Sequence, residues 1–190
     1  MRIGVYGGTF DPIHVAHIVV ACEVRHALDL DEVLLVPAGD PWQKRGLVEA
    51  SKDDRARMCE LAVDGVDGLR VSRIEVDREG ASVTAETLAA LSGPDRDLFL
   101  VLGADAIANM PTWRGLEATR TAATIAAVER DGEHATAPGP EWSMTHVPIP
   151  RLDVSSSEIR ARRRAGRPID GLVPAPVVRF IGEHDLYTRR

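Results

Sequence analysis

The sequence predicts an α/β fold, namely a Rossmann-like, doubly wound parallel sheet with a small helical part at the C-terminus. Three observations predict it. Strand-like and helix-like segments alternate along the chain, the strand-like segments are almost continuously apolar, and the first of them ends in Gly7-Gly8. Continuous apolar strands are typical of a parallel sheet that helices cover on both faces. The alternation favours right-handed crossovers and a doubly wound arrangement.

The strands are expected where short apolar runs end at turn residues. Glu32–Pro37 (EVLLVP) and Asp97–Leu102 (DLFLVL) are the clearest, because both read as strands buried on two faces. Ala122–Val128 has a periodicity that fits a strand or a helix, and its place in the alternation favours a strand. The complete set of expected strands is 2–6, 32–37, 69–76, 97–102, 122–128 and 147–149.

The helices are expected in the segments between these strands. Ser51 is followed three residues later by Asp54, which is a weak signal for the start of a helix. Three serines precede another helix-like segment near residue 155, and serine is a favoured residue at a helix N-terminus. The expected helices are 15–28, 51–63, 84–91, 155–164 and 175–183.

Length and composition indicate one ordinary globular domain. The 190 residues are long enough to bury a core, so we expect a single domain over 1–190 with a helical subregion from about 150 to 190. The segment Asp131–Ser143 (DGEHATAPGPEWS) reads as a loop that is too short to separate two domains. The sequence leaves open whether the chain forms homo-oligomers.

Charge and cysteine content exclude several classes of protein. The net charge of −6 argues against a general binder of nucleic acid or of anionic membranes. Cys22 and Cys59 fit neither a CxxC metal pattern nor a disulfide framework, which favours a reducing compartment. No apolar run approaches the roughly 18 residues of a membrane helix, and no export signal begins the sequence. We therefore expect a cytoplasmic protein without nucleic-acid or membrane partners.

The segment Gly7–His17 (GGTFDPIHVAH) carries the strongest chemical signal. Two glycines at a strand end allow a backbone to approach a ligand closely. His14 and His17 are three residues apart, so they share one face of the first turn of the next helix, where the helix dipole favours an anion. Two surface histidines beside a turn are the plain alternative, and a zinc site would need a third ligand. The segment is neither a GxGxxG fingerprint nor a P-loop.

A second segment, Ser155-Ser156-Ser157-Glu158-Ile159-Arg160, combines hydroxyls, free amides and an arginine in one helix turn. This combination suits a phosphate group. An ordinary capping box between Ser155 and Glu158 is an equally good interpretation of the serines.

Three further candidate site residues come after the ends of predicted strands. Asp105, after Gly103, can accept hydrogen bonds from a ribose, or can only cap the next helix. Trp113, beside Pro111, Thr112 and Arg114, can stack on a flat ring, and a cationic pyridinium suits it well, although a lone tryptophan is more often core. Lys44, with Arg45, can bring positive charge to phosphates, or can belong to a solvated loop.

Gly7–His17 resembles the GGTFDPxHxGH signature of the bacterial nicotinate-mononucleotide adenylyltransferases, within the HxGH nucleotidyltransferase superfamily. The likeness spans almost the whole chain, and the other motifs follow in family order. They are the Lys44 loop, the Thr84 turn (Val83–Thr87), Gly103-Ala104-Asp105, Pro111-Thr112-Trp113, the ISSTxIR-like Ser155–Arg160 and the tail Val173–Ile181. Several motifs in the right order are far more specific than any one of them.

The sequence departs from the family pattern at three positions. Ala16 stands where the HxGH signature has glycine, which adds one methyl group near the nucleotide. Ser157 replaces the usual threonine and keeps the hydroxyl. Arg130 matches an arginine that usually precedes Pro-Gly, but Asp131 replaces that proline.

The resemblance implies an enzyme that transfers adenylate from ATP to nicotinate mononucleotide in NAD biosynthesis, with Mg²⁺ accompanying ATP. It assigns His14, His17, Lys44 and Arg160 to the triphosphate, with Ser155, Ser156 and Ser157 beside them. The remaining assignments are Gly7, Gly8, Thr9, Phe10, Gly103 and Asp105 for the nucleotide, and Thr84, Trp113 and Arg130 for the pyridine mononucleotide.

Two alternatives remain open from the sequence. The nearest is a sister nucleotidyltransferase that acts on nicotinamide mononucleotide, pantetheine phosphate or glycerol phosphate. The other is a nucleotide sensor or nucleic-acid-binding module, suggested by five arginines within 160–167 and disfavoured by the acidic whole chain.

Overall fold

The computed structural model describes residues 1–44, 46–129 and 134–188. Within them lies a six-stranded sheet in which every neighbouring pair of strands is parallel. The strand order is β3-β2-β1-β4-β5-β6. The strands are β1 (Arg2–Gly8), β2 (Glu32–Pro37), β3 (Leu69–Val71), β4 (Asp97–Gly103), β5 (Thr124–Glu129) and β6 (Met144–Pro148). This order is the doubly wound arrangement that the sequence predicts.

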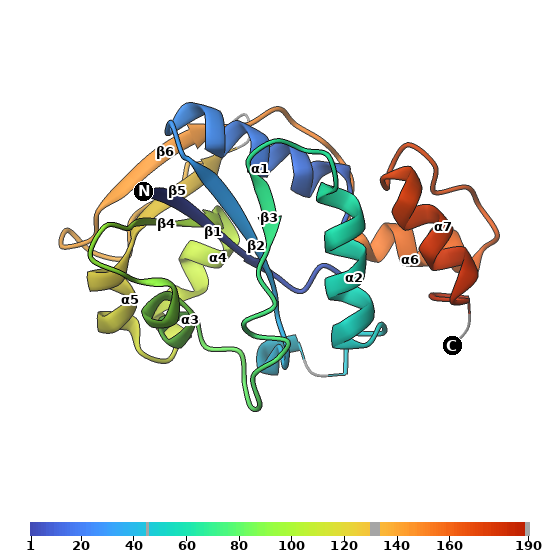
Figure 1. Cartoon of the computed structure of the whole chain (residues 1–190), viewed down its shortest axis with the longest axis horizontal. Helices are drawn as coiled ribbons and strands as arrows, with labels where there is room; N and C mark the ends of the chain where they lie inside the picture. The colour runs from blue at the N-terminus through green and yellow to red at the C-terminus, as the bar shows by residue number, and fades with distance from the viewer. Residues whose placement is uncertain (45, 130–133, 189–190) are drawn as a thin grey trace.

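Helices cover both faces of the sheet (Figure 1). The core on one face joins the strands to Val20, Met58, Ile159 and Val177, which come from α1, α2, α6 and α7. The core on the other face joins them to Leu88 of α3 and Ile107 of α4, with α5 beside them. The helices are α1 (Val15–Ala27), α2 (Lys52–Val63), α3 (Thr84–Leu91), α4 (Ala104–Asn109), α5 (Leu116–Ala122), α6 (Ser156–Arg164) and α7 (Ala175–Glu183), with short 3-10 turns η1 (Trp42–Lys44) and η2 (Met110–Thr112).

The direction of winding reverses between β1 and β4. The chain runs outward from β1 through β2 to β3 and then returns to the opposite side of β1 to begin β4. Since ligands of such sheets bind at the carboxyl ends of the strands where the order reverses, the segments after Gly8 and Gly103 are the expected place for a site. Both segments carry the motifs that the sequence singles out.

The predicted elements are confirmed, and two of them differ from the prediction by more than two residues at one end. The third strand does not run from 69 to 76, because the chain leaves the sheet after Val71 and turns, with the Asp77 amide donating to the Arg73 carbonyl. The last strand begins at Met144 rather than near residue 147. Helices α4 and α5 were given no bounds from sequence, because helices of six and seven residues are too short to show a periodicity.

The C-terminal helices lie where the sequence predicts them, next to α2 at one end of the molecule (Figure 1). Their apolar residues belong to the same core cluster as the sheet and α1. In the described part of the chain, no helix is long and apolar enough to cross a membrane.

Candidate active site

Two cavities meet at the carboxyl end of β1. One, of about 470 Å³, is bordered by His17, Ser157 and Arg160, and is called the His17 cavity here. The other, of about 420 Å³, is bordered by Thr84 and Trp113, and is called the Trp113 cavity. The residues that line both are Gly7, Gly8, Thr9, Leu102 and Ala106. The first loop of the chain and the end of β4 therefore form the partition between two compartments.

The two histidines stack on one another at the start of α1. Their ring centroids are 3.7 Å apart with an angle of 25° between the planes, and the His14 amide donates to Nδ1 of His17. His14 is the residue before the helix and is buried, whereas His17 lines the cavity. The helix begins at Val15, as expected, so His14 precedes its first turn instead of lying in it. His17 is thus the imidazole that a ligand in this cavity meets, and His14 lies behind it.

Glycine is needed in this loop for two different reasons. A Cβ at Gly8 would lie 2.7 Å from the ring of Phe10, which is buried and packs edge-on against His17 at 5.0 Å. A Cβ at Gly7 would meet no atom within 4 Å, because the space beside it belongs to the cavities. Phe10 itself has a φ of 49°, a left-handed conformation in which its ring supports the loop from within.

Arg160 reaches the His17 cavity from α6 and is held on three sides. Its Nη1 donates to the Asp11 carbonyl at 2.7 Å, its Nε to Oε1 of Glu49 at 2.9 Å, and its Nη2 to Oγ of Ser157 at 3.4 Å. Arg164 pairs with the same carboxylate at 2.8 Å. These contacts fix a cation in the cavity wall before any ligand enters, which reduces the ordering cost of binding an anion.

The three serines have different positions. Ser155 caps α6 by accepting a hydrogen bond from the Glu158 amide at 3.2 Å, and it is absent from the described walls of both cavities. Ser156 and Ser157 both line the His17 cavity, and Oγ of Ser156 also donates to the Pro12 carbonyl at 2.9 Å. The capping interpretation thus describes Ser155, and the phosphate interpretation has geometric support at Ser156 and Ser157.

The Trp113 cavity collects the predicted pyridine-site residues. Thr84, the first residue of α3, lines it together with Trp113, which is partly exposed at the end of η2. Asp105 lines the same cavity from the first turn of α4, whose N-cap is Gly103. The alternative that Asp105 caps this helix is therefore wrong. Gly103 lines the His17 cavity, and a Cβ there would meet no atom within 4 Å.

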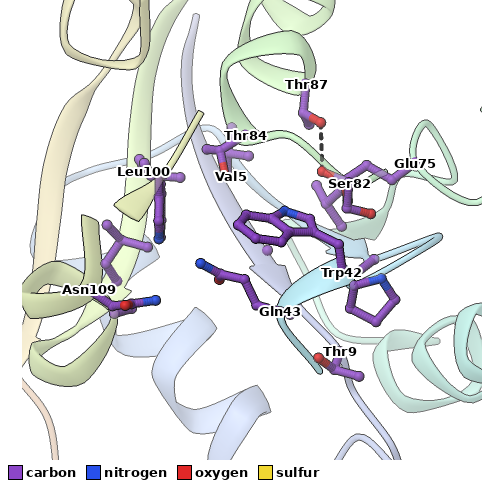
Figure 2. Close-up of a pocket in the computed structure, with 18 of the residues that line it drawn as sticks. Val5, Thr9, Trp42, Gln43, Glu75, Ser82, Thr84, Thr87, Leu100 and Asn109 are labelled. Atoms are coloured by element: carbon purple, nitrogen blue, oxygen red, sulfur yellow. Dashed lines mark hydrogen bonds between the residues drawn. The ribbon is translucent and has the colours of Figure 1, made fainter. Parts of the chain in front are cut away.

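A second tryptophan lies in this cavity and was not assigned from sequence. The indole of Trp42, from η1, extends across the cavity (Figure 2). The guanidinium of Arg114 lies over its ring, 5.1 Å from the centroid, and Nε2 of the neighbouring Gln43 donates to Oγ1 of Thr112 at 3.1 Å. These two contacts connect the segment after β2 to the segment after α4.

Asp11 organises the loop between β1 and α1. Its carboxylate is buried and accepts hydrogen bonds from the amides of Glu49 and Ala50, at 2.8 and 3.1 Å, and from the hydroxyl of Tyr187 at 2.7 Å. Burial and the nearby Asp11 carboxylate raise the pKa of Tyr187 well above its usual range, so the hydroxyl stays a donor. Asp11 therefore supports the site from behind.

Arg55 of α2 gives the same loop a second support. Its buried guanidinium donates to the carbonyls of Thr9 at 2.7 Å and Ala38 at 2.6 Å, which joins the ends of β1 and β2. Burial lowers its pKa, and Asp11 opposes that effect. No sequence motif indicates Arg55 or Tyr187, because their partners Thr9 and Asp11 lie 46 and 176 residues away along the chain.

Two of the predicted site residues lie wholly or partly outside the described part of the chain. Arg130 is outside the described residues. Lys44 belongs to η1, whose other residues, Trp42 and Gln43, line the Trp113 cavity, but its side chain is not described. Within the described part of the chain, no group of three or more His, Cys, Asp or Glu side chains is placed to hold a metal ion.

Comparison with known proteins supplies the family. Residues 5–162 match the model of the cytidylyltransferase-like family. A probable nicotinate-nucleotide adenylyltransferase of Corynebacterium kroppenstedtii is 44% identical over 191 residues, covering 98% of this chain and 90% of that protein. One from Bordetella pertussis is 41% identical, covering 98% of both chains. The chain belongs to the nicotinate-nucleotide adenylyltransferase family.

Solved structures agree with this placement at the level of the fold. The nicotinic acid mononucleotide adenylyltransferase of Plasmodium falciparum, in its complex with NaAD, superposes with a TM-score of 0.79 over 98% of this chain and 97% of that one. The identity is 20%, so this likeness concerns the fold alone. The sequence-based recognition of the family and of the fold is confirmed.

Proposed function

We propose that this adenylyltransferase-family protein transfers adenylate from ATP to nicotinate mononucleotide, forming nicotinate adenine dinucleotide and pyrophosphate in NAD biosynthesis. The observation that carries the proposal is the pair of cavities that meet at Gly7–Thr9. The His17 cavity offers imidazole, guanidinium and hydroxyl donors for a polyphosphate, and the Trp113 cavity offers indole faces for a flat ring. The names of the full-length relatives support the same assignment.

The arrangement suits a direct displacement at phosphorus. The 5′-phosphate of the mononucleotide is already a nucleophile at neutral pH and needs no general base. Its oxygen forms a bond to the α-phosphorus of ATP as the bond from that phosphorus to the bridging oxygen breaks, and pyrophosphate leaves with the electron pair. Holding two polyanions in line can contribute about 7–11 kcal/mol to such a step. Electrostatic stabilisation of the leaving group supplies a further large share.

Each residue has a role in this scheme. Arg160 and His17 donate to the triphosphate, and Ser156 and Ser157 stand beside them. Backbone groups of Gly7–Phe10, together with Gly103, approach the nucleotide phosphate and ribose, while His14 supports His17 from behind. Thr84 and Trp113 receive the pyridine ring. Lys44 and Arg130 keep the roles that the resemblance implies, at the triphosphate and the pyridine mononucleotide respectively.

A divalent metal accompanies ATP in nucleotidyltransferases, and we propose Mg²⁺ here. The side chains fit an ion that phosphates hold rather than an all-protein cage, since the described residues form no metal-binding cluster. Asp105 is the available carboxylate, whereas three donors already occupy that of Asp11. When bound, such an ion would offset the negative charge of the phosphates. We also propose a cytoplasmic location for this biosynthetic role.

The test is an assay of pyrophosphate release with ATP and a panel of phosphate acceptors. Nicotinate mononucleotide should be the best acceptor, ahead of nicotinamide mononucleotide, pantetheine phosphate and glycerol phosphate. His17→Ala should lower turnover by about two orders of magnitude or more, as the loss of a transition-state donor does. It should lower Tm by only about 2–4 °C, because the His14 amide loses an acceptor. Preference for pantetheine phosphate or glycerol phosphate would reject the proposal in favour of a sister enzyme.

A further inference from the structure

A buried acid lies in the wall of the Trp113 cavity. Glu75 is 9% exposed, and its Oε1 accepts a hydrogen bond from Oγ1 of Thr87 at 2.6 Å, close to the Trp42 indole (Figure 2). Its backbone packs against Gly39, where a Cβ would lie 2.0 Å from the Glu75 carbonyl oxygen. Glu75 is therefore held in place from both its side chain and its backbone.

The charge of this cavity is one-sided. Among the described side chains that line it, the charged ones are Glu75 and Asp105, and both are acids. Glu75 makes no ion pair with any described residue. The guanidinium of Arg114 lies over the Trp42 ring, 5.1 Å from its centroid, but Arg114 is not among the residues that line this cavity. A buried carboxylate is costly unless a cation compensates for it, so the cavity is suited to a ligand that brings positive charge.

The proposed substrate carries such a charge in its ring. The ring nitrogen of an oxidised pyridine mononucleotide is cationic, in the nicotinate form as in the nicotinamide form, and indole faces attract cations as well. Resting on the proposed function, we propose that Glu75 is the counter-charge for the pyridinium and makes the Trp113 cavity selective for oxidised over reduced pyridine mononucleotides. Glu75 is then a specificity-determining residue that the family motifs of the sequence do not single out.

The test compares each mononucleotide with its 1,4-dihydro form, whose ring is flat enough to enter and keeps its substituent, but whose ring nitrogen is uncharged. Binding is measured by calorimetry, and kcat and KM are measured with saturating ATP. The wild-type protein should bind the oxidised form about tenfold more tightly, which corresponds to about 1.4 kcal/mol. Equal affinity of the wild-type protein for the two forms would reject the proposal without any variant.

Glu75→Gln keeps the shape and the acceptor for Thr87 and removes only the charge. It should raise KM for the oxidised mononucleotide about tenfold and change that for the reduced form by less than about twofold. The KM for ATP should stay unchanged, because Glu75 does not line the His17 cavity. Stacking of the ring on the indoles contributes equally in the wild-type protein and in Glu75→Gln. This contribution therefore cancels when the ratios of KM for the oxidised and reduced forms are compared between the two proteins.

Thr87→Val is the matched control, because it removes the hydrogen bond and keeps the carboxylate. It should weaken both forms by the same factor. Should Glu75→Gln also weaken both forms equally, Glu75 is only a structural residue and the proposal fails. Should Asp105→Asn alone abolish the preference for the oxidised form, the counter-charge is Asp105. Absence of turnover with every mononucleotide rejects the proposed function instead, and the calorimetry still decides the role of Glu75.

Discussion

At the partition between the two cavities, the substitution of a single residue should affect activity without affecting the stability of the fold. A methyl group at Gly7 would meet no protein atom within 4 Å, yet Gly7 lines both cavities. Gly7→Ala should therefore leave Tm within about 1–2 °C and lower kcat/KM by about tenfold or more, because a misplaced substrate loses much of the benefit of positioning. Steady-state kinetics and a thermal melt measure the two effects.

Two other glycines provide controls for this prediction. A Cβ at Gly182, in α7, also meets nothing within 4 Å, and this residue lines neither cavity. Gly182→Ala should keep full activity and stabilise the helix by up to about 1 kcal/mol. Gly8→Ala should instead lower Tm, because its Cβ would lie 2.7 Å from the Phe10 ring. Full activity of Gly7→Ala would show that no ligand approaches this backbone.

At the level of single residues, the sequence predicted the residues that line the two cavities better than the residues that hold those cavities in shape. Gly7, His17, Arg160 and Trp113 stand in local motifs, and the structure brings them to two adjoining cavities. Asp11 lies inside a quoted motif but was given no role, because its donors come from segments 38–39 and 176 residues away. A spacing rule cannot detect such contacts, since only the fold brings the partners together.

Among the elements, the start of α6 distinguishes a helix-capping role of Ser155 from a role in ligand binding. Ser155 accepts from the Glu158 amide at the start of the helix that carries Arg160. Ser155→Ala should cost about 1 kcal/mol of unfolding free energy as a lost cap. In a protein of this size, that loss should lower Tm by about 2–4 °C. The KM for ATP should change by less than about twofold.

Ser155→Asp distinguishes the two interpretations further. Aspartate also caps a helix and favours its N-terminal dipole, so the variant should retain the Tm of the wild-type protein. If the nucleotide's phosphates contacted residue 155, the added negative charge would raise the KM for ATP strongly. A large increase in that KM would return Ser155 to the nucleotide site, where the resemblance to the family places it.

Element boundaries were predictable where burial dominates the sequence pattern. β2 has the predicted bounds and β4 extends the predicted strand by one residue, because continuous apolar runs specify a doubly covered strand. β3 ends early because the mixed apolar and polar pattern of residues 69–76 continues into a turn that places Glu75 beside Thr87. There the apolar residues Ile74 and Val76 pack in the core outside the strand, and hydrophobic periodicity does not distinguish such residues from those of a strand.

At the scale of the whole molecule, the C-terminal helices are joined to the site by core packing and by polar contacts. Ile159, Val177 and Ile181 share one cluster with the sheet and α1. Arg160 and Tyr187 also contact Asp11 in the first loop. Separate domains normally have separate cores, so these contacts favour a single folding unit over 1–190.

We therefore expect the chain to unfold in one transition, with equal calorimetric and van't Hoff enthalpies. Tyr187→Phe should lower Tm by about 2–4 °C without splitting that transition, since Asp11 loses one donor and keeps two backbone amides. Scanning calorimetry and limited proteolysis measure this behaviour. Two resolved transitions, or a protease-resistant fragment that ends near residue 150, would instead make the C-terminal helices a separate domain. The position of Arg160 in the His17 cavity would then depend on the docking of that domain rather than on the folding of a single unit.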